Sequence, residues 1–118
     1  MHSLLYKVLT IQEWEVVSQS GRISTQLDEA DGFIHLSSAS QLNMTLSLYF
    51  SQEESVLLLQ LSEAEIEDGL TYEYSPKRGK KFAHFYGELS ITKIVQSWYL
   101  DRSAFSLPGE VMREAEYD

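Results

Sequence analysis

The chain has 118 residues, 43% of them hydrophobic, no cysteine and a formal net charge of −9. This length and composition can build one hydrophobic core, so we expect a single domain over residues 1–118. The absence of cysteine excludes disulfides and thiolate metal sites, and the negative charge argues against binding to a nucleic-acid backbone. No signal-peptide pattern opens the chain, and no apolar run approaches the about 20 residues that cross a membrane, so we expect a cytoplasmic protein.

The first 32 residues predict a strand, a helix and a loop. Residues 4–10, LLYKVLT, suit a pleated strand. Thr10 is a predicted N-cap, Glu13 closes a capping box with it, and Gly21 is a predicted helix stop. Residues 22–32, which carry several Asp, Ser and Thr, predict a loop.

The stretch DGFIHLSS, residues 31–38, places a histidine inside an apolar run. In a strand, successive side chains point to opposite faces, so Phe33, His35 and Ser37 share one face and Ile34 and Leu36 share the other. We expect the aliphatic face to pack toward a helix, and His35 and Ser37 to line a cleft. The alternative is a core histidine whose ring nitrogens bond backbone carbonyls.

The middle of the chain predicts a second helix and a buried strand. Ser38 or Ser40 can cap the helix, and its buried stripe would be formed by Leu42, Leu46, Tyr49 and Phe50. Residues 55–61, SVLLLQL, form an unbroken apolar run that is typical of a central strand covered on both faces. Residues 62–69 predict a short helix or turn.

The later part of the chain is mostly strand-like. Strands are expected at residues 70–75, 81–89 and 91–100, and one helix near residues 110–116 in the acidic, weakly patterned tail 101–118. Helices placed early and strands placed late predict an α+β fold, with a small split or curved mixed sheet and two early helices. The expected core includes Trp14, Val17, Leu46, Leu58 and Ile94.

Residues 77–81, KRGKK, hold four of the nine Lys and Arg residues. One interpretation is a solvated hairpin tip. The other is a patch that steers an anion toward a neighbouring site, because local fields can differ from the net charge.

Three further side chains are candidates for chemistry. Alternation places Glu73 mid-strand between Thr71 and Ser75, and it puts His84 and Tyr86 on one face of their strand. Two histidines and a carboxylate could form a metal site, but the short helical spacing that makes such a signal specific is missing, so we expect no metal ligand. Neither a Gly-x-Ser-x-Gly elbow nor a glycine-rich phosphate loop occurs.

Several segments together resemble a small bacterial family, domain of unknown function 952 (DUF952). The resemblance covers about residues 4–100, in the right order, and includes EWEVV, VLLLQL and LTYEYS. Its most specific parts are Gly32-Phe33-Ile34-His35 with Ser37, and His84 with Tyr86-Gly87.

The resemblance implies a fold similar to ADP-ribosyltransferases, which bind NAD in a cleft between two sheets. The residue that holds the ribose would fall at Tyr6 or Lys7, and the residue that meets the nicotinamide at His35. The role of the glutamate that supports the reacting sugar would fall to Glu73 or to the segment 84–86. The family usually has His where this chain has Lys7, and frequently Pro where it has Ala83. A lysine cannot accept the hydrogen bond that an imidazole can, but its charge could meet a phosphate or carboxylate.

Three functions follow as alternatives. The first is an enzyme acting on NAD or another nucleotide-like or glycosidic substrate, with His35 and Glu73 as catalytic residues. Its substrate-binding residues would be Lys7, Ser37, His84 and Tyr86. The second is a non-catalytic module that binds a nucleotide or small anion in the same cleft. The third is a protein-interaction domain that uses the acidic tail. A small-molecule ligand is the expected partner, without nucleic acid or membrane, and the oligomeric state stays open.

Overall fold

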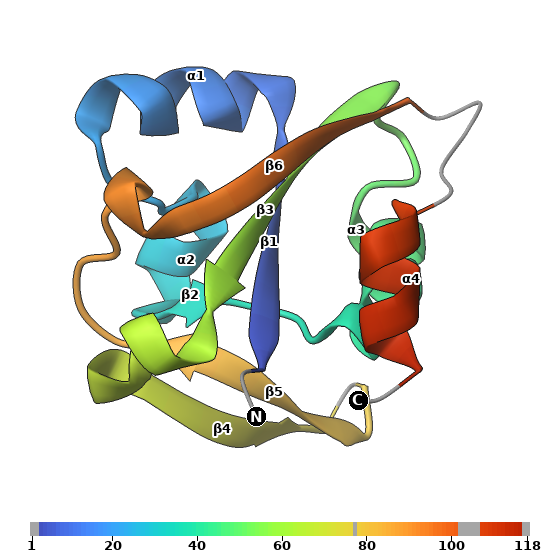
Figure 1. Ribbon diagram of the computed structural model, residues 1–118. Coiled ribbons are helices and arrows are strands. Elements are labelled where there is room, and N and C mark those ends of the chain that lie inside the picture. Colours follow the sequence, from blue (N-terminus) through green and yellow to red (C-terminus); the bar gives the residue numbers. More distant parts are fainter. Residues whose placement is uncertain (1–2, 77, 102–106, 117–118) are drawn as a thin grey trace.

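Two antiparallel sheets of three strands each organise the chain in the computed structural model, which describes residues 3–76, 78–101 and 107–116 (Figure 1). The first sheet has the order β1-β3-β6 and the second the order β2-β5-β4. The strands are β1 (Leu4–Thr10), β2 (Ile34–His35), β3 (Ser55–Ser62), β4 (Leu70–Ser75), β5 (Lys80–Phe85) and β6 (Ile94–Asp101). The helices are α1 (Ile11–Ser20), α2 (Gln26–Asp31), α3 (Leu42–Tyr49) and α4 (Gly109–Ala115). The α+β class predicted from the sequence is confirmed.

The first helix begins and ends where the sequence predicts. The Thr10 hydroxyl accepts the N–H of Glu13 at 3.0 Å, and the Glu13 carboxylate accepts the N–H of Thr10 at 2.8 Å. Gly21 closes the helix in the left-handed region, with φ of 77°, where a residue without Cβ is favoured. The short helix or turn predicted over residues 62–69 is confirmed as two 3₁₀ helices, Glu63–Glu65 and Glu67–Gly69. A further 3₁₀ helix, Ile91–Lys93, replaces the first residues of the strand expected at 91–100.

The loop predicted over residues 22–32 is wrong, because it contains helix α2. Thr25 and Asp28 form a reciprocal capping box, and Gly32 ends the helix with φ of 82°. The helix has only six residues, and its one aliphatic side chain beyond alanine, Leu27, is exposed, so it has no apolar stripe from which periodicity could reveal it. Its caps and the contacts of Asp28 hold it in place.

The first sheet carries a core on each of its faces. One core lies between the two sheets and beneath α1, and its buried members are Leu5, Leu9, Val17, Ile23, Ile34, Leu36, Leu57, Leu59, Leu61, Ile66, Ala83, Phe85 and Leu89. The other lies against α3 and α4, and its buried members are Tyr6, Val8, Ala39, Leu42, Leu46, Val56, Leu58, Leu100, Leu107 and Val111. Strand β3 contributes to both, so the prediction of a central strand covered on both faces is confirmed.

Several finer predictions need correction. Tyr49 is 56% exposed, because the end of α3 borders a cleft rather than the core. Trp14 and Ile94 are only partly buried at the edge of the core, whereas the other three predicted core residues are buried. Ile34 and Leu36 are buried as predicted, but they pack mainly between the sheets rather than toward a helix.

The two sheets are joined by the segment after β2. Its first residues pair with β5, and Leu36 donates its N–H to the carbonyl of Ala83 at 3.0 Å. Ser37 then turns to β1, where its N–H and carbonyl exchange hydrogen bonds with those of Tyr6 at 2.9 and 2.8 Å. A single segment therefore fixes the position of one sheet relative to the other.

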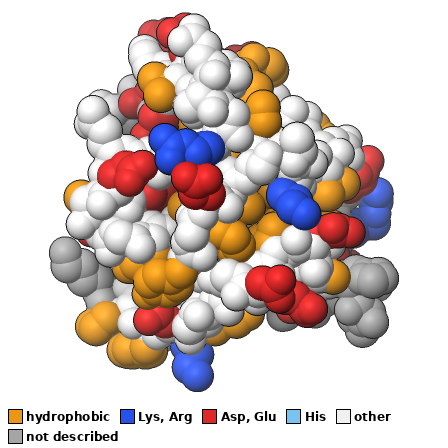
Figure 2. Space-filling model, turned by 90° about the vertical axis from the view of Figure 1, so that its left-hand side faces the viewer, with side chains coloured by type: hydrophobic (Ala, Val, Ile, Leu, Met, Phe, Trp, Pro, Cys, Tyr) orange, Lys and Arg blue, Asp and Glu red, His pale blue; other side chains and the backbone are white. Residues whose placement is uncertain are grey.

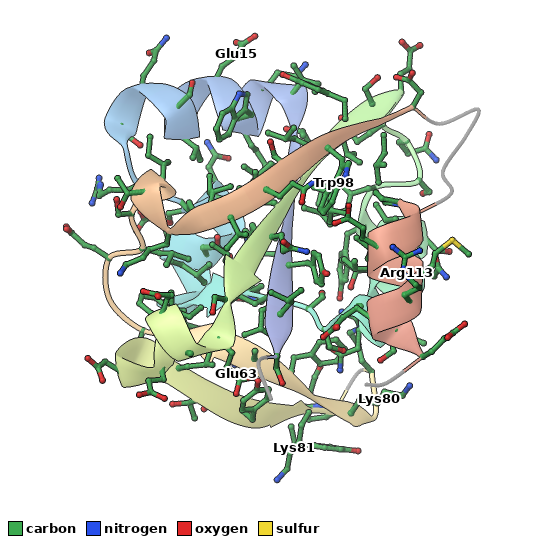
Figure 3. The ribbon with its side chains drawn as sticks, in the orientation of Figure 1. Glu15, Glu63, Lys80, Lys81, Trp98 and Arg113 are labelled. Atoms are coloured by element: carbon green, nitrogen blue, oxygen red, sulfur yellow. The ribbon has the colours of Figure 1, made fainter. Side chains whose placement is uncertain are left out.

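The surface shows no concentrated basic area on the face drawn in Figure 2, where basic side chains are separated by acidic and hydrophobic ones. Lys80 and Lys81 of the basic stretch are exposed and project away from the molecule (Figure 3). Among the described residues, none of the helices has the length and hydrophobicity to cross a membrane.

Candidate functional site

A cleft of about 620 Å³ opens between the two sheets, α2 and α3. Strand β1 contributes Lys7 to its wall, the segment after α2 contributes His35 and Ser37, and β5 contributes His84. Its aromatic lining comprises Tyr6, Phe33, Tyr49, Phe50, Tyr74 and Phe82, and its charged lining also includes Glu13, Asp28, Asp31 and Arg78. The volume lies within the range of about 300–1,000 Å³ that is usual for small-molecule sites.

Lys7 lies at the base of this cleft, on the same face of β1 as Leu5 and Leu9. Only 6% of its surface is exposed, so its charge must be balanced by protein groups. Its ammonium donates to Oδ1 of Asp28 at 3.0 Å and to the carbonyl of His35 at 3.1 Å, and it lies 2.8 Å from Oδ2 of Asp28. The ammonium therefore has two hydrogen-bond acceptors and a close ionic contact with the second oxygen of Asp28.

Asp28 connects Lys7 to His35. Besides the ammonium, its carboxylate accepts the backbone N–H of Thr25 at 3.0 Å, the backbone N–H of His35 at 3.1 Å and Nδ1 of His35 at 2.6 Å. Burial acts to raise the pKa of Asp28, but the hydrogen bond from His35 and the charge of Lys7 outweigh burial and lower this pKa to about 2. Burial lowers the pKa of Lys7, and Asp28 opposes that shift. Asp28 is therefore ionised at neutral pH and faces Lys7 as its counter-charge.

The imidazole of His35 lies between two carboxylates of α2. Nδ1 contacts buried Asp28, and Nε2 lies 2.9 Å from Oδ2 of Asp31, at a carboxylate that is 42% exposed. Carboxylate oxygens only accept hydrogen bonds, so both contacts form together when both ring nitrogens carry protons. With 33% of its side chain exposed, His35 presents an oriented imidazole to the cleft.

A second histidine with a carboxylate lies across Phe33. The Phe33 ring stacks on the His84 ring, with ring centroids 4.0 Å apart. It also contacts the His35 ring in a tilted arrangement, with centroids 4.6 Å apart. Nδ1 of His84 lies 2.8 Å from Oε1 of Glu73, which also accepts the hydroxyl of Tyr86 at 2.6 Å. These two contacts lower the pKa of Glu73, chiefly through the Tyr86 hydroxyl, and the same bond raises the pKa of Tyr86.

The opposite end of the cleft carries Arg78, from the turn between β4 and β5. Its Nη2 donates to Oγ1 of Thr45 at 3.1 Å, and Oγ1 of Thr45 lies 3.0 Å from Oγ of Ser37. Ser37 is buried and Thr45 lies on α3, so this chain of contacts ties three separate segments together.

The sequence-predicted site residues fall into two groups. Lys7, His35, Ser37 and His84 line the cleft together. Glu73 and Tyr86 are not among its lining residues, and they reach it only through the side chain of His84. The functional role of each of these six residues stays a prediction.

Sequence reasoning missed Asp28 and Asp31, and it considered Arg78 only as part of the basic stretch 77–81. Thr25 and Asp28 are spaced as a capping pair, and this signal could have revealed α2 and with it the two carboxylates beside His35. No comparable signal shows that Arg78 turns toward the cleft while Lys80 stays in solvent. Among the described residues, no three histidine or carboxylate side chains are arranged to hold a metal ion.

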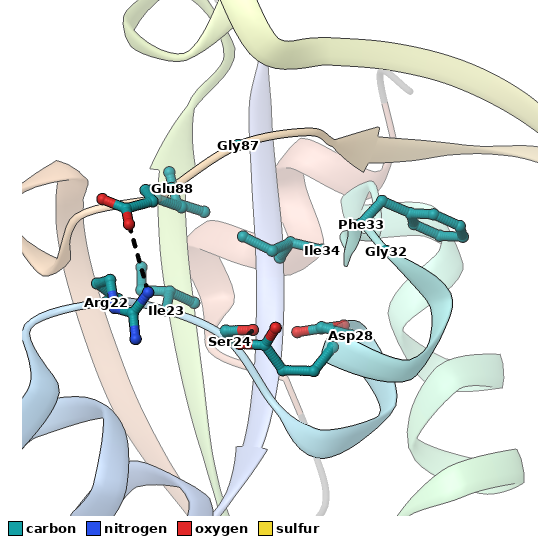
Figure 4. Close-up of a pocket in the computed structure, with 11 residues that line it drawn as sticks. Arg22, Ile23, Ser24, Asp28, Gly32, Phe33, Ile34, Gly87 and Glu88 are labelled. Carbon is teal, nitrogen blue, oxygen red and sulfur yellow. Dashed lines mark hydrogen bonds and ion pairs between the residues drawn. The ribbon is translucent and has the colours of Figure 1, made fainter.

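A smaller pocket of about 170 Å³ lies on the other side of α2 (Figure 4). Arg22 and Glu88 lie at its edge and form an exposed ion pair at 3.4 Å. Exposed pairs of this kind contribute little to stability, and no histidine lines the pocket. The larger cleft is therefore the stronger candidate for a functional site.

Comparison with known proteins identifies the family of the chain. A family model described as "Protein of unknown function (DUF952)" matches residues 8–97. The crystal structure of protein CC0527 from Caulobacter crescentus is similar, with 32% identity over 84% of this chain and 87% of that chain and a TM-score of 0.77. The solution NMR structure of CC0527 gives 31% identity over 91% and 88% of the two chains and a TM-score of 0.70. Among curated proteins, none matches the chain. Because the family model spans most of the chain and a relative of nearly equal length shares the fold, this protein belongs to the DUF952 family of proteins of unknown function.

Proposed function

We propose that the cleft binds a nucleotide-like small molecule, with NAD, ADP-ribose and AMP as the first candidates. The observation that carries this proposal is the meeting, in one cleft of about 620 Å³, of aromatic rings and convergent polar groups from both sheets. An ADP-ribosyltransferase-like fold would place a NAD cleft between two sheets in the same way. The fold analogy alone does not establish a function, so the proposal depends on the lining residues.

Exposed aromatic rings support a ligand with a flat heterocycle. Tyr74 is 60% exposed and Tyr49 is 56% exposed, and both line the cleft. Tyrosine rings left open beside a cleft offer stacking surfaces for a base. Asp31, also in the lining, supplies a hydrogen-bonding group for a sugar.

A thermal-shift and calorimetric titration tests the proposal, with NAD, ADP-ribose, AMP and adenosine as probes. A ligand present at 100 times its dissociation constant raises the free energy of unfolding by about 2.7 kcal/mol. Tyr74→Ser should weaken binding by about 1–3 kcal/mol through lost stacking. Tyr99→Ser is the matched control, because Tyr99 is 67% exposed on edge strand β6 and does not line the cleft. If none of the four probes binds, or if both variants weaken binding equally, the proposal is wrong.

A catalytic function is the second candidate, and the position of Asp31 favours it. The carboxylate of Asp31 lines the cleft beside Nε2 of His35 and is partly exposed. In hydrolysis at a glycosidic carbon, the bond to the leaving base breaks and its electron pair goes to the base, while a water oxygen bonds to the carbon and releases a proton to the solvent. A carboxylate stabilises the positive charge that develops on the sugar during this step. Asp31 could serve in this role, for which the sequence favours Glu73, while His35 would orient the base.

Release of nicotinamide from NAD, measured by chromatography, tests the catalytic candidate. Asp31→Asn should abolish release if Asp31 stabilises the sugar cation, whereas Asp68→Asn, at an exposed aspartate away from the cleft, should leave it unchanged. Glu73→Gln tests the carboxylate favoured by the sequence. Binding of NAD without any nicotinamide release would leave the protein as a binding module.

A further inference from the structure

Arg78 is the cleft cation whose charge the described protein leaves unbalanced. The chain has 18 acidic and 9 basic residues, so an arginine can find a carboxylate easily. Lys7, the other cation among the lining residues, is paired with Asp28 at 2.8 Å. Within the described part of the chain, no carboxylate lies within ion-pair distance of Arg78. Its surroundings therefore leave a positive charge available to a ligand.

The guanidinium is nevertheless fixed in orientation. Its Cζ lies 3.9 Å from the centroid of the Phe82 ring and 5.7 Å from that of Tyr49. Phe82 is buried, and Nη2 is tethered to Thr45. Aromatic faces attract a cation without neutralising it, so these contacts hold the plane of the guanidinium and keep its charge.

One donor of this group lacks an acceptor. Nε of Arg78 is buried and makes no hydrogen bond to any described residue. Buried N–H groups are nearly always paired, so this unpaired donor shows that the protein leaves part of the hydrogen-bonding capacity of the guanidinium unused. Burial also lowers the pKa of Arg78, with Tyr49 opposing the shift, which fits a cation that has lost water without gaining an anion.

Two hydroxyl groups extend this donor set. Oγ1 of Thr45 accepts from Arg78 and lies 3.0 Å from Oγ of Ser37. One hydroxyl proton serves the bond between Thr45 and Ser37, and the other can turn toward a ligand. A carboxylate offers two oxygens in a plane, whereas a phosphoryl group offers three in a pyramid. A guanidinium edge with a hydroxyl donor to one side suits the three-oxygen group better. Tyr49 and Tyr74 stand at the same end of the cleft, where a base could stack.

We infer that Arg78, Thr45 and Ser37 form a phosphoryl-binding subsite at the β4–β5 end of the cleft. This inference rests on the proposed binding of a nucleotide-like ligand, and it assigns the end at which the phosphate of that ligand is held. Exposed Lys80 and Lys81, on the strand that follows Arg78, add positive potential outside the subsite and would favour the approach of an anion.

Calorimetric titration of AMP and of adenosine tests the assignment, because the two ligands differ only by the phosphate. Wild-type protein should bind AMP about ten- to hundredfold more tightly than adenosine. Arg78→Gln should remove this preference and leave adenosine affinity unchanged, and Arg78→Lys should restore only part of it, since lysine lacks the planar fork. Arg22→Gln is the matched control, as it removes the same charge from an exposed ion pair outside the cleft. A preference for AMP that survives Arg78→Gln overturns the assignment.

Failure of the subsite and failure of the proposed function give different results. If adenosine and AMP bind wild-type protein equally, the cleft still binds a nucleoside and the phosphoryl subsite is wrong. If neither binds, the proposed function fails, and inorganic phosphate becomes the probe, with the NMR signal of the Arg78 Nε–H as readout and that of Arg22 as internal control. A shift of the Arg78 signal by phosphate, larger than by acetate at equal concentration, supports the subsite. No shift, or an equal shift with acetate, overturns it.

Discussion

Lys7 and Arg78 line the same cleft, but the protein treats the two charges in opposite ways. The ammonium of Lys7 meets three protein oxygens at 2.8–3.1 Å, two of them from ionised Asp28. The guanidinium of Arg78 meets two aromatic rings and one hydroxyl, and its Nε has no acceptor among the described residues. We expect the cation that a buried carboxylate balances to serve the fold, and the cation that is held in place without a counter-charge to be available to a ligand.

Local sequence explains why only the lysine needed a partner. Alternation along β1 forces Lys7 to the face that carries Leu5 and Leu9, where water cannot reach its charge. Arg78 lies in a turn that Gly79 closes with φ of 67°, and no strand register dictates its direction. The inward placement of Arg78 is therefore not a consequence of strand geometry. The burial of Lys7, in contrast, follows from its position in β1.

Removing Asp28 should produce the largest effect, because it leaves a buried cation without its counter-charge. We expect Asp28→Ala to lower the free energy of unfolding by about 3–5 kcal/mol, measured by urea denaturation. Adding Lys7→Met should recover part of this loss, since the unpaired charge disappears. Asp31→Ala, in the same helix at a partly exposed carboxylate, is the control and should cost much less. Equal instability of the single and double variants would show that helix capping, rather than the lysine, determines the loss.

The second largest effect is expected from acid, which protonates Asp28 and so removes the counter-charge of Lys7. The pKa of Asp28 falls from its ordinary 3.8 to about 2 in the folded protein. The stabilisation from the charged carboxylate is therefore complete above about pH 4 and is lost as the pH falls through 2, with a total of about 2 kcal/mol. Denaturation curves of wild-type protein and Asp28→Asn across this range should differ in slope, with the variant less dependent on pH. Parallel curves would contradict the assignment of this shift to Asp28.

The smallest effect on the free energy of unfolding is expected from a substitution of Arg78. Without ligand, Arg78→Gln should change the free energy of unfolding by less than about 1 kcal/mol, because no ionic partner is lost. Lys7→Gln, which breaks a buried pair, should cost several times more. The two variants can be compared under identical denaturant conditions. If Arg78→Gln destabilises the protein as strongly as Lys7→Gln, both charges are structural and the contrast between the two ends disappears.

Sequence reasoning succeeded where the deciding interaction was local or periodic. The capping box at Thr10 and the stop at Gly21 act within one turn of helix, and the apolar run 55–61 records that β3 is covered on both faces. The opposite faces of Ile34 and His35 follow from alternation alone. Such features need no knowledge of distant residues.

It failed where the deciding contact joins distant parts of the chain. The partner of Lys7 lies 21 residues away on a helix too short to leave a periodic pattern. Arg78 reaches Thr45 across 33 residues, and nothing in the sequence around it distinguishes this inward cation from exposed Lys80 and Lys81. Tyr49 occupies a helical position that fits the apolar stripe, but the cleft takes the place of the core beside it.

The joint between the two sheets has a consequence for the internal motions of the molecule. Tyr6 and Ser37 exchange two backbone hydrogen bonds where one sheet meets the other. Any fluctuation that spreads the sheets apart must break this pair, even while the ladders within each sheet stay intact. The amide protons of these two residues would then exchange with solvent deuterium at a common rate, set by separation of the layers rather than by unfolding of either one. A molecule bound to both sheets across the cleft would slow that rate. Slower exchange of these two amide protons would therefore indicate that the cleft is occupied, although neither amide contacts the ligand.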